Sequence, residues 1–178
     1  KEARERVRAA LSNCGLSFPF NQRITVNLAP ADLPKESGRF DLPIAVGILA
    51  AMGELDLSRL DGLVLAGELS LGGELRPVRG ALPMALALSQ VGDGQQGVQS
   101  GGTSSVVKAL VLPLDSAQEA ALVEGVPVYG ARHLAEVVAA LRPQTEAHGA
   151  TEWTKVTAAM CEAGSSALAD WRDVRGQG

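Results

Sequence analysis

The segment from Leu42 to Met52 constrains the fold most, because it is apolar on nearly every side when drawn as a helix. Asp41 stands where an N-cap residue is expected, and Pro43 is tolerated in the first turn. Phe40 precedes this cap and is placed as a hydrophobic staple towards Ala45. A helix without a polar face must be covered by other elements, so we expect it at the centre of a layered domain.

Strands and helices alternate along most of the chain. Apolar periodicity predicts strands at 23–29, 62–70, 74–78, 108–112 and 126–129, and helices at 1–14, 81–91, 117–123 and 133–141. The run Leu71-Gly72-Gly73 separates two of the strands and is typical of a β-hairpin turn. An apolar fraction of 46% with 20% charge is that of an ordinary soluble domain. We therefore predict one α/β or α+β layered domain.

Two segments fall outside this alternation. Residues Gly92 to Ser105 are rich in glycine, serine and glutamine, which predicts a flexible surface insertion. From Pro143 to about Ala169 the residues become small and polar, which predicts a linker with one helical stretch near 153–161. The chain starts with Lys1 and has no signal-peptide pattern, so we expect it to be a segment of a longer protein.

Three motifs of nucleotide and acyl chemistry are out of context or missing. Gly92-x-Gly94-x-x-Gly97 matches the dinucleotide fingerprint, but here a helix comes before it and a polar tract follows. Ser105 and Lys108 form an S-x-x-K that enters a strand, where side chains three residues apart point to opposite faces. No glycine is followed by lysine, so the chain has no P-loop and we expect no bound nucleotide.

Residues that commonly bind metals are scattered. Cys14 and Cys161 lie far apart without C-x-x-C or histidine spacing, which indicates reduced, cytoplasmic thiols. Neither His133 nor His148 has a partner at ligand spacing, and we expect the first to start a helix and the second to lie in the linker. Three carboxylates near the turn before the apolar helix are more simply turn and cap residues than cation ligands: Asp32, Glu36 and Asp41. We therefore expect no metal site.

Charge is evenly mixed at the start of the chain and acidic later. Residues 1–80 hold ten basic and ten acidic side chains, residues 81–178 hold six and ten, and the net charge is −4. A duplex-binding surface needs clustered cations, so we expect any contact with nucleic acid to be weak. No stretch approaches the roughly 20 apolar residues of a membrane helix. We therefore expect no membrane-spanning segment and no membrane among the partners.

Several long runs carry a resemblance to a known family. They are Arg23-Ile-Thr-Val-Asn-Leu-Ala-Pro-Ala-Asp-Leu-Pro-Lys-Glu36, Arg39-Phe-Asp-Leu-Pro-Ile-Ala45, Gly67-Glu-Leu-Ser-Leu71, Glu74-Leu-Arg-Pro-Val-Arg-Gly-Ala-Leu-Pro83 and Val128-Tyr-Gly-Ala-Arg-His-Leu134. Together they resemble the N-terminal domain of the ComM/YifB family of magnesium-chelatase-like AAA+ proteins. Asp173-Val-Arg-Gly-Gln177 is similar to the opening of that family's ATPase module.

The resemblance implies a division of the chain. Residues 1–141 correspond to the N-terminal domain without its first strands, 142–170 to a linker, and 171–178 to the start of the ATPase module. It places ATP and magnesium in that module, beyond this chain. The family's metal-chelatase name derives from the ATPase module and implies no porphyrin chemistry here.

The same domain is similar in fold to the proteolytic domain of Lon, which implies an α+β domain of ribosomal-protein-like β-α-β type, with helices packed on a mixed sheet. Lon places a nucleophilic serine at a helix start and a lysine that accepts its proton. Counting without gaps along the matching turns puts Phe40 and Leu82 at these two positions. Neither side chain is a nucleophile or a base, so the resemblance implies a non-catalytic domain. The alternative is a serine-dependent peptidase or esterase that uses Ser37, within the turn.

For the whole protein, the resemblance implies a bacterial AAA+ ring, with ComM as a hexameric helicase that drives branch migration during natural transformation. We expect this domain to help assemble the ring from copies of itself and to guide DNA weakly in the cytoplasm. Four cations on the two Lon-like turns are the candidate contacts: Lys35, Arg39, Arg76 and Arg79. The simpler interpretation is that they are solvated turn residues, because useful affinity for DNA needs several clustered cations.

Overall fold

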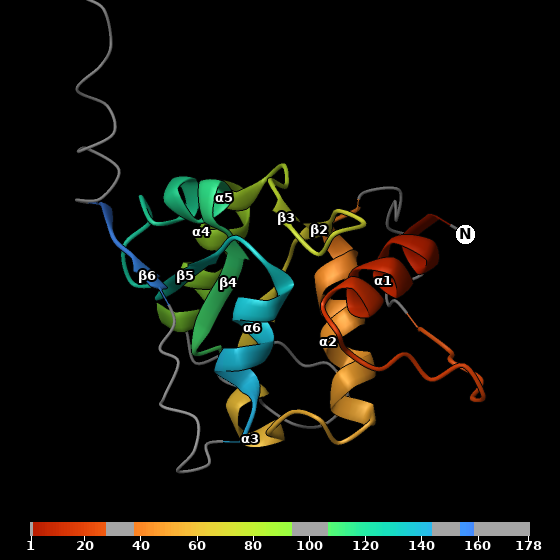
Figure 1. Cartoon of the computed structure of the whole chain (residues 1–178). Helices are drawn as coiled ribbons and strands as arrows, with labels where there is room; N and C mark the ends of the chain where they lie inside the picture. Colours follow the sequence, from red (N-terminus) through yellow and green to blue (C-terminus); the bar gives the residue numbers. More distant parts are fainter. Residues whose placement is uncertain (1, 28–37, 94–106, 144–153, 159–178) are drawn as a thin grey trace, which may run out of the picture.

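The computed structural model describes residues 2–27, 38–93, 107–143 and 154–158. Helices and strands alternate through these ranges (Figure 1). The helices are α1 (Glu2–Asn13), α2 (Asp41–Ala51), α3 (Leu57–Leu60), α4 (Ala81–Asp93), α5 (Leu114–Ala120) and α6 (Leu134–Leu141), with a 3-10 turn η1 (Gly38–Phe40) before α2. The strands are β1 (Leu63–Leu65), β2 (Glu68–Leu69), β3 (Leu75–Arg76), β4 (Ala109–Pro113), β5 (Val128–Ala131) and β6 (Thr154–Val156).

The strands form two sheets. The larger has the order β1-β4-β5-β6, with β1, β4 and β5 parallel and β6 antiparallel at the edge. The smaller is the antiparallel hairpin β2-β3. All five residues of β4 are buried, as expected for a central parallel strand that is covered on both faces. The predicted α+β layered domain with a mixed sheet is confirmed.

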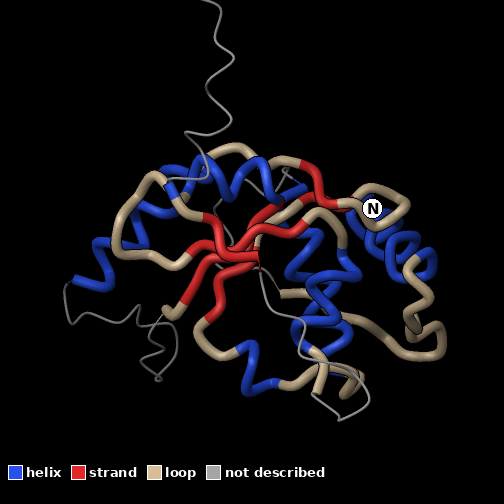
Figure 2. Tube along the Cα trace, turned by 60° about the vertical axis from the view of Figure 1, so that its left-hand side comes forward, coloured by secondary structure: helices blue, strands red, loops and turns tan. Residues whose placement is uncertain are grey.

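Helices cover the large sheet on both faces, as Figure 2 shows. On one face α4 and α5 pack against Leu110 and Leu112 of β4 and Val128 of β5. On the other face α1, α2 and α6 form a second core with the β2-β3 hairpin. No helix in the described ranges is both long enough and apolar enough to cross a membrane.

The apolar helix is α2, and its central place is confirmed, but it is not covered on every side. Leu42 and Leu49 are fully buried in the core with α1. Gly47 and Ala51 are exposed within the part of the chain that the structure describes. One side of this apolar helix is therefore open.

The predicted hairpin from 62 to 78 is correct only for its second half. β2 and β3 pair as expected, but β1 leaves the hairpin and pairs in parallel with β4, Leu63 beside Ala109. The chain changes sheet at Ala66 and Gly67. Parallel pairing with a strand that comes more than forty residues later has no local sequence signal, because local patterns report only neighbours in the chain.

The prediction of a strand at 23–29 is wrong for its described part, 23–27, which the structure leaves without strand pairing. Residues 21–27 are all exposed, and β-branched residues form a strand only where a partner strand and a packed face are present. The reverse error occurs in the expected linker. Residues 154–156, where a helical stretch was predicted, form strand β6 on the edge of the sheet.

The other predicted elements are confirmed within a few residues. Residues 1–14, 81–91 and 133–141 correspond to α1, α4 and α6, and 108–112 and 126–129 correspond to β4 and β5. The helix predicted at 117–123 begins and ends three residues earlier, as α5. The proposed insertion lies at 92–105, of which 94–105 are outside the described residues, as are 171–178.

Candidate functional site

The start of α2 is held by a buried ion pair. Both carboxylate oxygens of Asp41 accept hydrogen bonds from Arg6 of α1, at 2.7 Å from Nε and 3.2 Å from Nη2. The same carboxylate accepts a hydrogen bond of 3.3 Å from the amide of Leu69 in β2. Asp41 is fully buried, and the hydrogen bond to it raises the pKa of Arg6. The arrangement locks α1, α2 and the hairpin together.

Asp41 is therefore not the N-cap residue that its position in the sequence predicted. The N-cap is Phe40, which makes no side-chain capping hydrogen bond, and Asp41 is the first helical residue. The carboxylate has turned to the guanidinium, because a buried charge is stabilised more by an opposite charge than by a cap alone. No signal within α1 or α2 alone pairs Arg6 with Asp41, which are 35 residues apart.

The turn before α2 is also joined to the hairpin by its backbone. The carbonyl of Arg39 accepts a hydrogen bond of 2.9 Å from Gly67, whose carbonyl accepts one of 3.0 Å from Leu42. Gly67 has no room for a side chain, since a Cβ would lie 2.9 Å from Leu75. The first turn of α2 is thus fixed relative to the β1-β2 connection.

The two positions at which the resemblance to Lon led us to expect its catalytic pair lie at the starts of two different helices. Phe40 is half-buried before α2, and Leu82 is half-buried in the first turn of α4. Ser37 lies outside the described residues. Ser116, which the sequence did not single out, is buried, accepts a hydrogen bond of 2.9 Å from the amide of Val78 and lies 3.3 Å from its carbonyl. Its hydroxyl joins α5 to the connection between β3 and α4.

Three of the four candidate DNA contacts lie in the described part of the chain. Arg76 and Arg79 are exposed, Arg39 is half-buried, and Lys35 falls outside the described residues. Arg76 stands opposite Glu68 in the β2-β3 register, so an acidic residue lies among these cations. The 3-10 turn η1 contacts β2, which pairs with β3 in the hairpin. The two turns that carry the candidate cations are therefore connected through this hairpin, but they do not form a purely basic surface.

His133 caps α6, in agreement with its predicted place at the start of a helix. Its Nδ1 accepts a hydrogen bond of 3.2 Å from the amide of Ala135, which assigns the proton to Nε2. Nε2 lies 3.1 Å from the carbonyl of Gly72 and donates to it. On the other side of this turn, Asn13 donates to the carbonyl of Leu71 at 2.7 Å.

Cys14 lies against the same turn. A Cβ on Gly73 would lie 2.6 Å from Cys14 Sγ and 3.0 Å from a carbon of the His133 ring. Partial burial raises the pKa of the Cys14 thiol, which disfavours the nucleophilic thiolate. His133 uses both nitrogens in hydrogen bonds, so we assign this pair a structural role.

Metal ligands do not gather in the described ranges, where no three His, Cys, Asp or Glu side chains lie in a metal-binding arrangement. Of the three carboxylates considered from the sequence, Asp41 binds Arg6, and Asp32 and Glu36 are outside the described residues. His148 and Cys161 are outside them as well.

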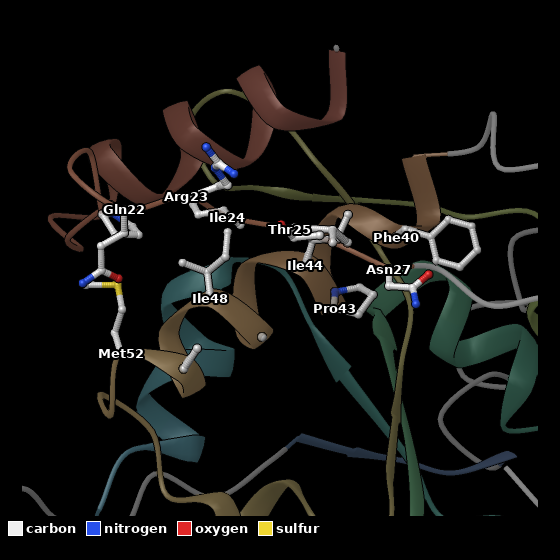
Figure 3. Close-up of a pocket in the computed structure, with 14 residues that line it drawn as sticks. Gln22, Arg23, Ile24, Thr25, Asn27, Phe40, Pro43, Ile44, Ile48 and Met52 are labelled. Carbon is white, nitrogen blue, oxygen red and sulfur yellow. The ribbon is translucent and has the colours of Figure 1, made fainter. Parts of the chain in front are cut away.

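Two hollows lie beside α2, and we call them together the α2 groove; exposed Gly47 and Ala51 line the first of them. They have volumes of about 540 and 590 Å³, and both are lined by Gln22, Arg23, Ile24 and Val26 of the extended segment after α1. Figure 3 shows Ile44 and Ile48 directed from α2 towards that segment, with Met52 near one end and Phe40 near the other. The second hollow reaches α1 and is lined by Arg4, Arg8, Phe18 and Phe20, among others. No local pattern in the sequence predicts this groove, because it depends on how three separate segments pack.

Comparisons with known proteins agree on one family. Residues 1–97, more than half of the chain, match the family described as subunit ChlI of Mg-chelatase. The chain is 43% identical to competence protein ComM of Haemophilus influenzae over 177 residues, which are 99% of this chain and 31% of that protein. It is 41% identical to the YifB proteins of Salmonella typhimurium and Escherichia coli, over 99% and 96% of this chain and 30% of each relative. The chain thus spans less than a third of the length of these relatives.

Proposed function

The chain belongs to the family of the Mg-chelatase subunit ChlI, with ComM and YifB proteins as its relatives, and we propose that it is a non-catalytic domain of a ring-forming ATPase. In this role it supports assembly of the ring and guides DNA during recombination. The similarity to a protein named for competence supports this assignment. Competence is the uptake of DNA, so a DNA substrate fits that name.

The observation that carries the non-catalytic part is the pair Phe40 and Leu82. Both are half-buried apolar side chains at helix starts, where the resembling protease has its serine and its lysine. An acyl-transfer site needs an activated nucleophile and a base within hydrogen-bond reach. Neither Phe40 nor Leu82 supplies such a group, and Asp41 beside Phe40 is already bound by Arg6.

ATP fits no residue pattern of this chain, because no glycine is followed by lysine and the P-loop is missing. We therefore assign ATP and magnesium to the part of the longer relatives that this chain does not span. We place the protein in the cytoplasm, in keeping with Cys14, which is a free thiol.

A charge-reversal experiment on the full-length protein tests the DNA role. Arg39→Glu combined with Arg79→Glu should weaken binding to DNA and reduce the slope of log K against log salt by about one to two, since each lost phosphate contact contributes about 0.9. Arg142→Glu is the matched control, because Arg142 is exposed and directly follows α6. Figure 1 shows that the C-terminal end of α6 lies near α3, away from the β2-β3 hairpin. An unchanged salt slope in the double variant would reject DNA guidance by these turns.

A second experiment separates the non-catalytic domain from a serine hydrolase. A fluorophosphonate probe should leave Ser37 unlabelled, and casein should not be degraded by the purified chain. Stoichiometric labelling that disappears in Ser37→Ala would overturn the proposal. Branch migration by the full-length protein, measured with and without residues 1–141, then shows whether the domain is needed by the motor.

A further inference from the structure

Ser116 carries a buried hydroxyl to which the proposed function gives no role. The residue lies in α5 and is 3% exposed. Its hydroxyl accepts a hydrogen bond of 2.9 Å from the amide of Val78 and donates one of 3.3 Å to the carbonyl of the same residue. One side chain thereby binds both backbone polar groups of a residue between β3 and α4. Displacement of this backbone would leave buried polar groups unpaired, which makes the contact a strong restraint.

The helix that carries this hydroxyl is itself closely packed. Ala117 and Ala120 of α5 are fully buried. They share a core with Ala81 and Ala85 of α4, and the two helices lie side by side (Figure 1). Small side chains let helices approach closely, and a densely packed interior resists displacement. The Ser116 hydroxyl therefore has a fixed place relative to the start of α4.

The residue bound by Ser116 directly precedes Arg79, one of the candidate DNA contacts. The side chain of Val78 is half-buried and packs against the same core. On the other side of Arg79, the carbonyl of Gly80 accepts a hydrogen bond of 3.1 Å from the amide of Met84, and Ala81 is fully buried. The backbone of Arg79 is thus fixed from both directions, whereas its side chain is exposed.

Arg79 is also not engaged by a carboxylate of the described chain. None of the ion pairs that join described residues includes it. An exposed cation on a fixed backbone is suited to bind a phosphate, because little backbone entropy is lost on binding. The same cation on a loose turn would lose more entropy and bind more weakly.

We propose that Ser116 is a positioning residue for DNA binding. Its hydroxyl holds the turn from Val78 to Gly80, so that Arg79 binds a phosphate without further ordering of the backbone. Ser116 is buried and does not contact DNA itself. This inference rests on the DNA role proposed for Arg79, and it adds a residue that carries no charge. It has one consequence that a merely structural role lacks, since the effect of Ser116 on DNA affinity must act through Arg79.

A double-mutant cycle in the full-length protein tests this consequence. Ser116→Ala should lower the affinity for a fluorescein-labelled DNA duplex about threefold to tenfold, measured by anisotropy at fixed salt, because the turn must then be ordered on binding. The slope of log K against log salt should stay unchanged, since no cation is removed, whereas Arg79→Ala should reduce it by about 0.9. In the Arg79→Ala background, Ser116→Ala should have no further effect on affinity.

A matched serine and a readout without DNA complete the test. Ser70→Ala is the control, because Ser70 is also buried and its hydroxyl also accepts a hydrogen bond from a backbone amide, that of Glu74 at 3.0 Å. It should lower the thermal stability about as much as Ser116→Ala but leave DNA affinity unchanged. Hydrogen exchange of residues 78–80 should be faster in Ser116→Ala than in the wild type. Insertion of one glycine after Arg79 loosens the turn with Ser116 intact, and it should weaken DNA binding to a similar extent.

The possible failures can be told apart. Unchanged exchange in Ser116→Ala would show that the hydroxyl does not hold the turn, and unchanged affinity would show that holding it does not matter for DNA. An equal loss of affinity with and without Arg79 would identify a general structural effect. Each of these results would overturn the proposal. If Arg79→Ala binds DNA like the wild type, the proposed DNA contact is itself rejected, and the positioning role is rejected with it.

Discussion

The guanidinium of Arg6 and the carboxylate of Asp41 join two helices through hydrogen bonds of 2.7 and 3.2 Å. The two side chains differ in burial: Asp41 is 1% exposed and Arg6 is 26% exposed. The charge that remains after one partner is removed therefore lies in a different environment, depending on which partner is lost. The carboxylate would remain in a dry site, whereas the guanidinium could regain water.

This difference predicts the order of two stabilities. Arg6→Ala should lower the free energy of unfolding by about 3 kcal/mol, because it leaves a buried carboxylate without its counter-ion. Asp41→Asn should cost less, about 1 to 2 kcal/mol, since the amide still accepts the hydrogen bond from Leu69. Urea denaturation measures both. Glu2→Ala is the control and should change stability by less than about 0.5 kcal/mol, because Glu2 is exposed and its ion pair with Arg6 is long, at 3.9 Å.

Gly73 and Gly80 form a natural pair for separating backbone strain from steric overlap. Their φ angles are 92° and 85°, but only at Gly73 would a Cβ overlap a neighbour, Cys14 Sγ at 2.6 Å. Gly80→Ala should cost about 1 to 2 kcal/mol for the left-handed backbone, and Gly73→Ala about 1 to 3 kcal/mol more. Adding Cys14→Ala should recover part of that excess in urea denaturation. A purely additive double variant would show that the sulfur is not the obstacle.

His133 permits a test of the cap on α6. His133→Ala should destabilise the protein by about 1 kcal/mol, because the amide of Ala135 loses its acceptor. His133→Asn should retain most of that contribution, since an asparagine oxygen can cap the helix in its place. Thermal unfolding compares the two. If both variants lose the same stability, the contact with Gly72 is responsible and the cap is not.

Asp56 should make stability depend on pH in the acid range. Its carboxylate accepts hydrogen bonds from the hydroxyl and amide of Ser58, which lower its pKa below the ordinary value of 3.8. The charged form is favoured by folding, so its contribution is complete above pH 3.8 and is lost as the pH falls through the lowered pKa. The stability gap between wild type and Asp56→Ala should be constant near neutral pH and shrink in acid. Ser58→Ala should weaken this pH dependence, and a gap that widens in acid would contradict the assignment.

The sequence predicted the elements that local pattern determines. The helices that correspond to α1, α2, α4 and α6 and the buried strand β4 follow from apolar spacing, and their boundaries differ from the structure by a few residues. The errors occur where pairing with a strand that is distant in the sequence determines the secondary structure. Residues 23–27 have a strand-like sequence without a described partner strand, and Thr154–Val156 become a strand because β5 provides one.

The site was less predictable than the fold. Phe40 and Leu82 were proposed by comparing turns, which are local features, and their correspondence to the Lon pair stays a prediction. The Arg6–Asp41 pair, the Ser116 contact and the α2 groove arise from segments that are far apart in the chain, and no spacing in the sequence reports them. The apolar pattern of α2 even predicted cover on all sides, whereas the fold leaves Gly47 exposed.

The parallel pairing of β1 with β4 affects the order in which the chain can fold while it is being synthesised. Leu63 pairs beside Ala109, and the amide of Asp56 donates to the carbonyl of Leu141 at 2.9 Å. During synthesis, the region around α3 and β1 therefore cannot form these contacts until β4 and α6 have left the ribosome. A nascent chain that stops before residue 141 keeps this region accessible to proteases and chaperones, and it closes only when α6 emerges.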